Sequence, residues 1–188
     1  MSKGKLLVIS GPSAGVGKDT IVRMFLEKHP DWYRPASLTT RTPRPGETAG
    51  VDYFFIDRLE FEDKIKKDEL LEWSEVTGNL YGTLRKPVQD LLDSGKNILL
   101  LKEYVGTLAI KRHLPQTITV FLVPDNEKAL EQRIRARATD TQEIIQQRLQ
   151  LAKKELSHKD KLDFVIVNPT GHPEEALEAV EKAVGLLA

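Results

Sequence analysis

The sequence predicts an α/β fold with a central parallel sheet flanked by helices, and three observations support this class. An apolar run at residues 6–9 leads into a glycine-rich stretch and then a helix-length segment. Further apolar runs recur at 98–101, 118–122 and 164–167, separated by segments long enough for helices. These runs are continuous and not alternating, as expected of strands that are buried on both faces of a parallel sheet. In such sheets, ligands bind at the carboxyl ends of the strands.

Composition narrows the possible functions. The chain has 188 residues, enough for one full core and a small inserted lobe. Its 28 basic residues balance 28 acidic ones, so we expect no general affinity for nucleic acid or for anionic membranes. With no cysteine, thiol catalysis and thiolate metal sites are excluded, and the four histidines show no metal-ligand spacing. No apolar segment approaches the ~20 residues of a membrane span, so we expect a soluble, cytoplasmic protein.

The most informative stretch follows the first predicted strand, where a glycine-rich segment leads into a helix and carries Lys18 near its end. Glycines let the backbone curl until several N–H groups point at one place. The helix N-terminus adds a positive dipole, and the lysine adds a mobile charge. This combination predicts a site for the phosphates of a nucleoside triphosphate. The segment consists of Gly11, Pro12, Ser13, Ala14, Gly15, Val16, Gly17, Lys18, Asp19 and Thr20.

This segment departs from the usual phosphate-loop pattern, which has four residues between its first glycine and a Gly-Lys pair that is followed by Ser or Thr. Here Pro12 stands where that first glycine would fall, so a loop that starts at Gly11 is one residue longer. Asp19 follows the lysine, and the hydroxyl suited to a magnesium ion comes one residue later, at Thr20. The alternative is an ordinary glycine-rich turn between a strand and a helix.

The later elements follow in the order that a parallel sheet needs. Apolar windows of helical length with proline or glycine stops define the helices, and continuous apolar runs define the strands. In chain order we predict a helix at 20–28 ended by Pro30, short β-like pieces with a charged helix near 60–68, a helix at 87–94 ended by Gly95, a strand at 98–101, a helix at 105–113, a strand at 118–122, helices at 127–137 and 142–157, a strand at 164–167 and a helix from 173.

One region differs in composition from the rest. The stretch 34–83 contains short β-like pieces and a Pro/Gly-rich turn, which indicates a lobe inserted into the main fold. We therefore predict a core made of residues 1–33 and 84–188 and an inserted lobe at 34–83. A short polar connection between two helices predicts a lid at about 135–145, over a phosphate chain.

Three arginines near this lid are candidates for binding an anion. Arg133 and Arg137 are four residues apart and share a helix face, where like charges repel, and Arg148 lies on the next helix. An anionic ligand between them would relieve this repulsion. The alternative is a pair of solvated helix faces, with Glu131 and Glu143 as ion-pair partners.

A second candidate anion site lies in the predicted lobe. Arg41 and Arg44 flank Pro43 in a rigid turn, and Tyr53 and Tyr81 offer phenolic donors in the same lobe. Guanidinium and hydroxyl groups together suit a monophosphate, because charged hydrogen bonds are the strong ones. Taken singly, each of these side chains is more often an ordinary surface or core residue.

Two carboxylates stand at informative places. Glu72 is next to Trp73 in an apolar stretch and would need a donor partner if it is buried. Glu103 follows the predicted strand 98–101, at the end of the sheet where a catalytic centre is expected. The alternatives are an exposed helix-end charge for the first and a structural carboxylate for the second.

Nearly end to end, these segments resemble the guanylate kinase family of P-loop nucleoside monophosphate kinases. The arginine-rich turn followed by Val-Asp-Tyr-Phe-Phe is highly specific to this family. The matching segments are the phosphate loop, residues 37–47, 50–55, 71–73, 78–83 and 133–140, and Arg148. The resemblance implies a P-loop kinase fold with an inserted GMP-binding lobe and a short lid.

The resemblance also implies an activity, the transfer of the γ-phosphoryl group of ATP to GMP with Mg²⁺ bridging the ATP phosphates. It implies that Arg41, Arg44, Tyr53 and Tyr81 hold the GMP phosphate, that Ser37, Glu72 and Thr83 read guanine, and that Glu103 contacts ribose or the magnesium shell together with Thr20. On the ATP side it implies the whole phosphate loop, Arg133, Arg137 and Asn168. The expected catalytic residues are Lys18, Arg41, Arg133, Arg137 and Arg148.

Some positions depart from the family pattern. Leu101 replaces an acid and Glu103 stands for an aspartate, in a stretch that the family fills with acid, apolar residue and aspartate. Ala136 and Ala138 replace lid glycines, which predicts slower lid motion because alanine has less backbone freedom. Pro169 follows Asn168 where an acid is common.

Two other functions therefore stay open. One is a guanylate-kinase-like binding module with impaired ATP chemistry, and the other is a related kinase with a different phosphorylated acceptor. The expected partners are small molecules, GMP and ATP, with no nucleic acid and no membrane. The sequence leaves open whether the protein is a monomer or a homodimer.

Overall fold

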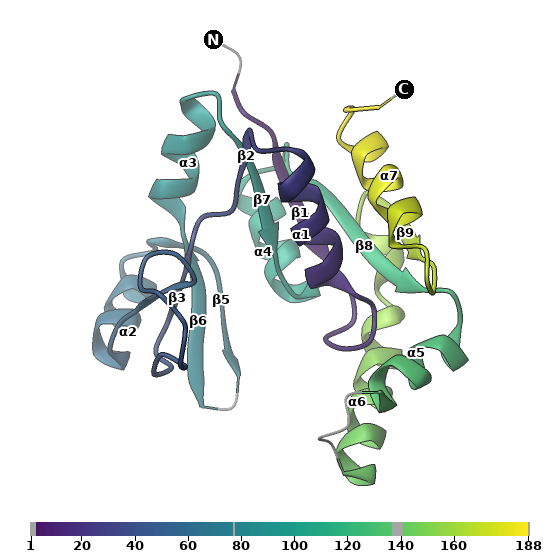
Figure 1. Cartoon of the computed structure of the whole chain (residues 1–188). Helices are drawn as coiled ribbons and strands as arrows, with labels where there is room; N and C mark the ends of the chain where they lie inside the picture. The colour runs from purple at the N-terminus through teal and green to yellow at the C-terminus, as the bar shows by residue number, and fades with distance from the viewer. Residues whose placement is uncertain (1–2, 77, 137–140, 188) are drawn as a thin grey trace.

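The computed structural model describes residues 3–76, 78–136 and 141–187, and within them the strands form a large sheet and a small sheet (Figure 1). The large sheet has five strands in the order β2-β7-β1-β8-β9, and every neighbouring pair is parallel. The predicted parallel sheet is therefore confirmed. Its strands are β1 (Leu6–Ser10), β2 (Trp32–Tyr33), β7 (Asn97–Leu101), β8 (Ile118–Pro124) and β9 (Phe164–Asn168).

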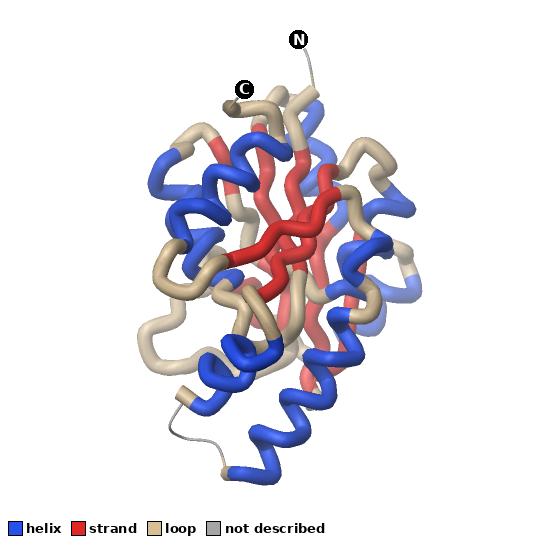
Figure 2. Tube along the Cα trace, turned by 90° about the vertical axis from the view of Figure 1, so that its right-hand side faces the viewer, coloured by secondary structure: helices blue, strands red, loops and turns tan. Residues whose placement is uncertain are grey.

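Helices cover both faces of this sheet, as the view in Figure 2 shows. Along β1, Leu7 and Ile9 pack on one side with residues of α1, α5, α6 and α7, while Leu6 and Val8 pack on the other with residues of α3 and α4. This two-sided burial is why the strand sequence is apolar at consecutive positions. The helices are α1 (Lys18–Lys28), α3 (Arg85–Asp93), α4 (Tyr104–His113), α5 (Glu127–Arg135), α6 (Gln142–Leu156) and α7 (Pro173–Ala183), with a 3₁₀ turn at Lys159–Lys161.

The small sheet lies in the stretch that differs in composition. Its order is β4-β3-β6-β5, with β3 and β4 parallel and the other pairs antiparallel. Phe61 of the covering helix is fully buried against Leu38, Leu70 and Leu80, which gives this region its own apolar cluster. The elements are β3 (Ser37–Thr39), β4 (Tyr53–Phe55), α2 (Arg58–Lys66), β5 (Leu70–Val76) and β6 (Asn79–Leu84).

The small sheet is joined to the core through β5. Leu71 of β5 belongs to the same buried cluster as Val8 of β1 and Ile110 of α4. The next residue, Glu72, therefore lies where the two sheets approach each other. This junction positions the candidate site.

Several helix boundaries differ from the predicted ones for local reasons. α1 begins at Lys18, directly after the left-handed Gly17, and so includes the lysine that was predicted to precede it. α3 begins at Arg85 and not at Pro87, because proline is tolerated in a first helical turn and does not mark its start. α2 begins at Arg58 because Asp57 caps it, accepting from the Glu60 N–H at 2.7 Å.

The end of α5 also differs. The helix ends at Arg135, whereas the predicted helix extended to 137, and residues 137–140 lie outside the described part of the chain. Among the described residues, no helix combines the length and the apolar character needed to cross a membrane.

Candidate active site

The glycine-rich loop between β1 and α1 has the backbone shape that its sequence predicts. Gly15 and Gly17 have φ values of 80° and 74°, in the left-handed region that favours glycine. A Cβ at Gly17 would come within 2.6 Å of the Asn168 side-chain nitrogen, and one at Gly15 would come within 2.7 Å of Leu130. Residues of β9 and α5 therefore pack directly against the loop, and neither glycine can be replaced without moving a neighbour.

Asn168 and Arg133, both predicted for ATP binding, donate to backbone carbonyls of this loop, Arg133 to that of Gly15 at 3.5 Å. Asn168 is 5% exposed, and its amide donates to the carbonyl of Val16 at 2.8 Å. Arg133 donates to the backbone carbonyl of Asn168 at 2.9 Å and to the Thr170 hydroxyl at 2.8 Å. Thr170 in turn donates to Asp125, which lowers the pKa of that carboxyl. These bonds join the end of β9 to the loop and to α5.

The loop also bonds to the far end of α6. The Ser13 N–H donates to one carboxylate oxygen of Glu155 at 2.8 Å, and the Ser13 hydroxyl donates to the other at 2.5 Å. The same hydroxyl lies 3.3 Å from Glu103 Oε1. The ammonium of Lys18 donates to the loop carbonyls of Gly11, at 3.3 Å, and Pro12. A carboxylate of the protein itself therefore occupies one of the N–H groups expected to bind a phosphate.

The remaining predicted lid residues are only partly described. Arg148 is half-buried on α6, seven residues before Glu155 and thus on the same side of the helix. Arg137 and Ala138 lie outside the described residues. Glu131, considered as a partner for the lid arginines, pairs with Arg135 at 2.7 Å.

The predicted monophosphate residues gather in the small sheet. The Arg41 guanidinium bonds both oxygens of Glu47, at 2.7 and 3.0 Å, and lies 5.5 Å from the centre of the Tyr53 ring. The Tyr53 and Tyr81 rings are 6.1 Å apart. The backbone N–H of Arg44 donates to Glu47 at 2.7 Å, while the Arg44 side chain is exposed. The hydrogen bonds from Arg41 and then Arg44 lower the pKa of Glu47.

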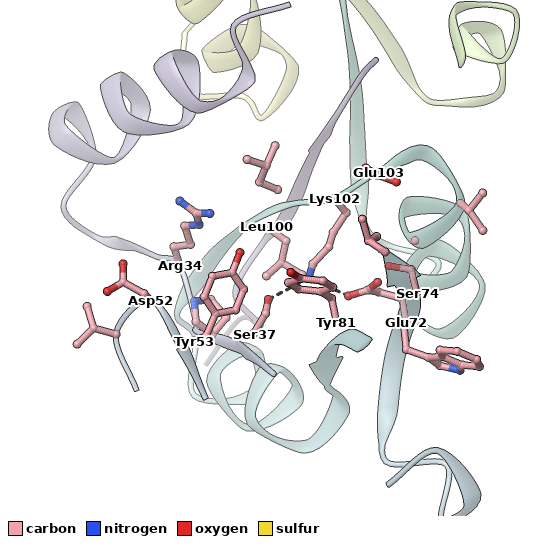
Figure 3. Close-up of a pocket in the computed structure, with 17 residues that line it drawn as sticks. Arg34, Ser37, Asp52, Tyr53, Glu72, Ser74, Tyr81, Leu100, Lys102 and Glu103 are labelled. Carbon is pink, nitrogen blue, oxygen red and sulfur yellow. Dashed lines mark hydrogen bonds and ion pairs between the residues drawn. The ribbon is translucent and has the colours of Figure 1, made fainter. Parts of the chain in front are cut away.

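A cavity of about 400 Å³ lies between the small sheet and the carboxyl end of β7 (Figure 3). At its base Glu72, 7% exposed, accepts from the Thr83 hydroxyl at 2.6 Å. The Lys102 ammonium bonds the same Glu72 oxygen at 2.8 Å and donates to the Ser37 hydroxyl at 3.0 Å. A buried Glu72 requires a hydrogen-bond donor, and it has two, Thr83 and Lys102. We name this set of Ser37, Glu72, Thr83 and Lys102 the base-end cluster.

Gly106 of α4 leaves room for this carboxylate. A Cβ at Gly106 would come within 2.9 Å of Glu72 Oε2, the oxygen that does not bond Lys102 or Thr83. Gly106 lines the cavity together with Tyr53, Tyr81 and Glu103. Glu103 also approaches Ser13, so it lies where the cavity meets the phosphate loop. The cavity, which Tyr53 and Tyr81 line, therefore adjoins the predicted loop at Glu103.

Two of the described residues, Thr20 and Glu103, were predicted to hold a metal ion. Within the described part of the chain, no group of three or more acidic or histidine residues is arranged to hold a metal. Thr20 is exposed in the first turn of α1, and Glu103 is an exposed carboxylate beside the loop. Mg²⁺ is usually held by one or two protein ligands and by substrate phosphates, so these residues fit it.

Two residues of this site were missed from the sequence. Lys102 had a signal, since a lysine follows a continuous apolar strand at a position where the resemblance predicts an apolar residue. Glu155 had none, because it is one of several charged residues near the end of α6 and its contact with Ser13 joins positions 142 residues apart.

The fold and the loop together define a class of protein, an α/β fold with a glycine-rich loop of the phosphate-binding type before its first helix. A shikimate kinase from Bacteroides thetaiotaomicron shares this fold with a TM-score of 0.51 at 12% identity, over 96% of this chain and 98% of that one. The family model for guanylate kinase matches residues 3–185. The chain belongs to the guanylate kinase family.

Individual relatives agree with this assignment. A guanylate kinase of Synechococcus sp. (strain JA-3-3Ab) is 46% identical over 96% of this chain and 82% of its own length. One of Prochlorococcus marinus (strain NATL2A) is 43% identical over 98% of both chains. The crystal structure of guanylate kinase from Anaplasma phagocytophilum superposes with a TM-score of 0.75 at 32% identity, over 98% of this chain and 86% of that one.

Proposed function

We propose that this protein is a guanylate kinase that transfers the γ-phosphoryl group of ATP to GMP, giving ADP and GDP. The observation that supports this function most strongly is the buried carboxylate of Glu72, at the base of a cavity that adjoins the phosphate loop. A carboxylate accepts from the N1–H and 2-amino groups of guanine but opposes the N1 lone pair of adenine. Such a buried mismatch discriminates by about 10⁴ or more.

On the acceptor side, we assign the phosphate of GMP to the guanidinium and phenol groups near the mouth of the cavity. Arg41 with Tyr53 and Tyr81 forms a cluster, and Arg44 is exposed on the same turn. Arg41 would exchange or share its bond to Glu47 when it binds the phosphate, because one guanidinium edge is now occupied. Ser37 and Thr83 support the base through the base-end cluster.

On the donor side, we assign the ATP phosphates to the loop N–H groups and to Lys18. Asn168 and Arg133 hold the loop backbone in place through hydrogen bonds to its carbonyls. Arg137 and Arg148 are proposed to close over the phosphates. Mg²⁺ would be held by Thr20 and Glu103 with the phosphates, and it supplies neutralisation of the charge on the transferred group. Alignment and charge neutralisation suffice for this reaction, so no covalent intermediate is proposed.

The proposed reaction needs the two sides to approach and exclude water. We propose that residues 1–33 and 84–188 form the core, that 34–83 form the GMP-binding lobe, and that a lid at about 135–145 closes from α5 and α6. The cytoplasmic location stays a prediction, and whether the protein is a monomer or a homodimer stays open.

Measuring ADP formation with ATP, magnesium and one acceptor at a time tests this function. The acceptors are GMP, AMP, UMP and dTMP, with a reaction without acceptor as control. We expect turnover with GMP alone. Turnover with another monophosphate and not with GMP would show that this other monophosphate is the acceptor. Calorimetric binding of GMP without any turnover would contradict the kinase and favour a binding module.

A further inference from the structure

Lys102 follows the buried strand β7 at the edge of the sheet where ligands bind, yet the expected reading of guanine gives it no part. Its side chain is 11% exposed and lines the cavity. Figure 3 shows it between Ser37 and Glu72, with an interaction drawn to each. A lysine held this way at the base of a cavity is a candidate for contacting the ligand.

The number of its donors makes this argument stronger. An ammonium has three N–H groups. Among the described residues its partners are the Ser37 hydroxyl and Glu72 Oε1. The side chain is 11% exposed and borders the cavity, so its third N–H group is available to an acceptor that enters the cavity. The cavity that Lys102 lines is where a ligand supplies that acceptor.

Glu72 and Lys102 place an acceptor beside a donor, and guanine has the complementary order on one edge. Its N1–H and 2-amino groups are donors, and its 6-carbonyl oxygen is a neighbouring acceptor that lysine commonly binds. We propose that Lys102 donates to O6 of guanine while Glu72 accepts from N1–H and the 2-amino group. Lys102 is then a second specificity-determining residue, an inference that rests on the proposed function.

This arrangement rejects adenine at two atoms. The N1 lone pair of adenine meets the carboxylate of Glu72, and its 6-amino group meets the ammonium of Lys102. In each case two like hydrogen-bonding groups face each other in a buried place, where they cannot turn to water. The 6-position is therefore read by Lys102 and the 1- and 2-positions by Glu72.

A purely structural lysine would behave differently, and one atom of the substrate separates the two roles. If Lys102 only held Glu72 in place, its loss would lower turnover of every guanine nucleotide equally. If it contacts O6, its loss matters most for a substrate with a strong acceptor there. The analogue 6-thio-GMP keeps N1–H and the 2-amino group but has sulfur, a weak acceptor, at position 6.

The experiment measures kcat/KM for GMP and 6-thio-GMP and takes their ratio in each variant. In the unaltered protein we expect GMP to be preferred, and in Lys102→Met we expect this preference to fall by about 10- to 100-fold. Lys102→Arg, which keeps charged donors, should retain most of the preference. Lys86→Met on α3, which removes an exposed lysine paired with Asp90, is the matched control and should leave the ratio unchanged.

The ratio separates the possible failures. If GMP turnover falls but the ratio is unchanged in Lys102→Met, Lys102 only supports Glu72 and the inference is overturned. If that variant does not fold by circular dichroism, Lys102→Gln carries the test, and the ratio must still fall severalfold because the charge is lost. Absence of GMP turnover in the unaltered protein would overturn the proposed function and this inference with it.

Discussion

The base end of the cavity and the phosphate loop meet at Glu103, but their polar groups are satisfied in opposite ways. In the base-end cluster Glu72 bonds to Thr83 and to an ammonium of opposite charge, so the buried charges match. At the loop, the N–H of Ser13 bonds to Glu155, a carboxylate that comes from α6. The first set can receive a neutral base without losing a bond. The second must release its carboxylate before a phosphate takes the same N–H.

This difference teaches where the protein is preorganised and where it exchanges partners. Fixed donors and acceptors at the base end cost nothing to reorganise when the ligand arrives, which favours specificity. At the loop, the Glu155 carboxylate occupies an N–H that an anionic ligand needs, and we expect this competition to lower ATP affinity. Substitutions at the two places should therefore act on different substrates and, in one case, with opposite sign.

The largest expected effect is that of Glu72→Gln. Its amide keeps one acceptor oxygen but replaces the other by a donor, which would face one of the two guanine N–H donors, so kcat/KM for GMP should fall by about 10³- to 10⁴-fold while ATP binding is kept. Steady-state kinetics and ATP calorimetry measure both. Glu75→Gln on the exposed side of the same strand is the control. Equal losses for GMP and ATP would mean that Glu72 supports the whole site and does not read the base.

Lys18→Met should come next. Losing this charge near the transferred phosphoryl group should lower kcat by about 10²- to 10³-fold and leave GMP binding measurable, because the base-end cluster is untouched. Arg23→Met, which removes an exposed cation from the same helix, should have little effect. Turnover that survives in Lys18→Met would show that another cation serves the phosphates.

A smaller loss is expected from Gly106→Ala. The added methyl group would press on Glu72 Oε2, so kcat/KM for GMP should fall by about 10-fold through a displaced carboxylate, a loss of about 1.4 kcal/mol. Alanine favours a helix over glycine by about 0.8–1 kcal/mol, so the melting temperature should not fall. Activity lost together with stability would point to general damage to α4 and not to the carboxylate.

The smallest effect has the opposite sign. Glu155→Gln removes the charge that competes for the Ser13 N–H, and a charged hydrogen bond is stronger than a neutral one by about 1 kcal/mol. The KM for ATP should therefore fall by about 5-fold, with GMP affinity unchanged. Glu178→Gln on α7, paired with Lys182, is a matched control. A weaker affinity for ATP would show that Glu155 supports the loop when ATP is bound.

The sequence was sufficient for those parts of the fold that local chemistry determines. Strands buried on both faces leave continuous apolar runs, and Gly15 and Gly17 mark positive φ angles that other residues rarely adopt. Glu72 was recognised as a residue that needs a donor, but the identity of that donor was not predicted. Lys102 reaches it across the junction of two sheets, which no spacing along the chain encodes.

Long-range contacts explain the other gaps as well. Arg133 was expected to share a lid face with Arg137, but its guanidinium donates to Gly15, Asn168 and Thr170, because the end of β9 lies beside α5. The contact between Ser13 and Glu155 likewise depends on where α6 ends relative to the loop. Such geometry follows from packing of whole elements and not from the residues in any one window.

The Ser13 contacts have a consequence for the order of events. The Ser13 hydroxyl contacts both Glu103, beside the cavity, and Glu155, near the end of α6. Since the backbone N–H of Ser13 can serve only one anion at a time, we expect a phosphate that binds there to displace the Glu155 carboxylate in the same event. We expect Glu155 to keep its hydrogen bonds to Ser13 while ATP is absent, so that binding of GMP alone leaves these bonds in place.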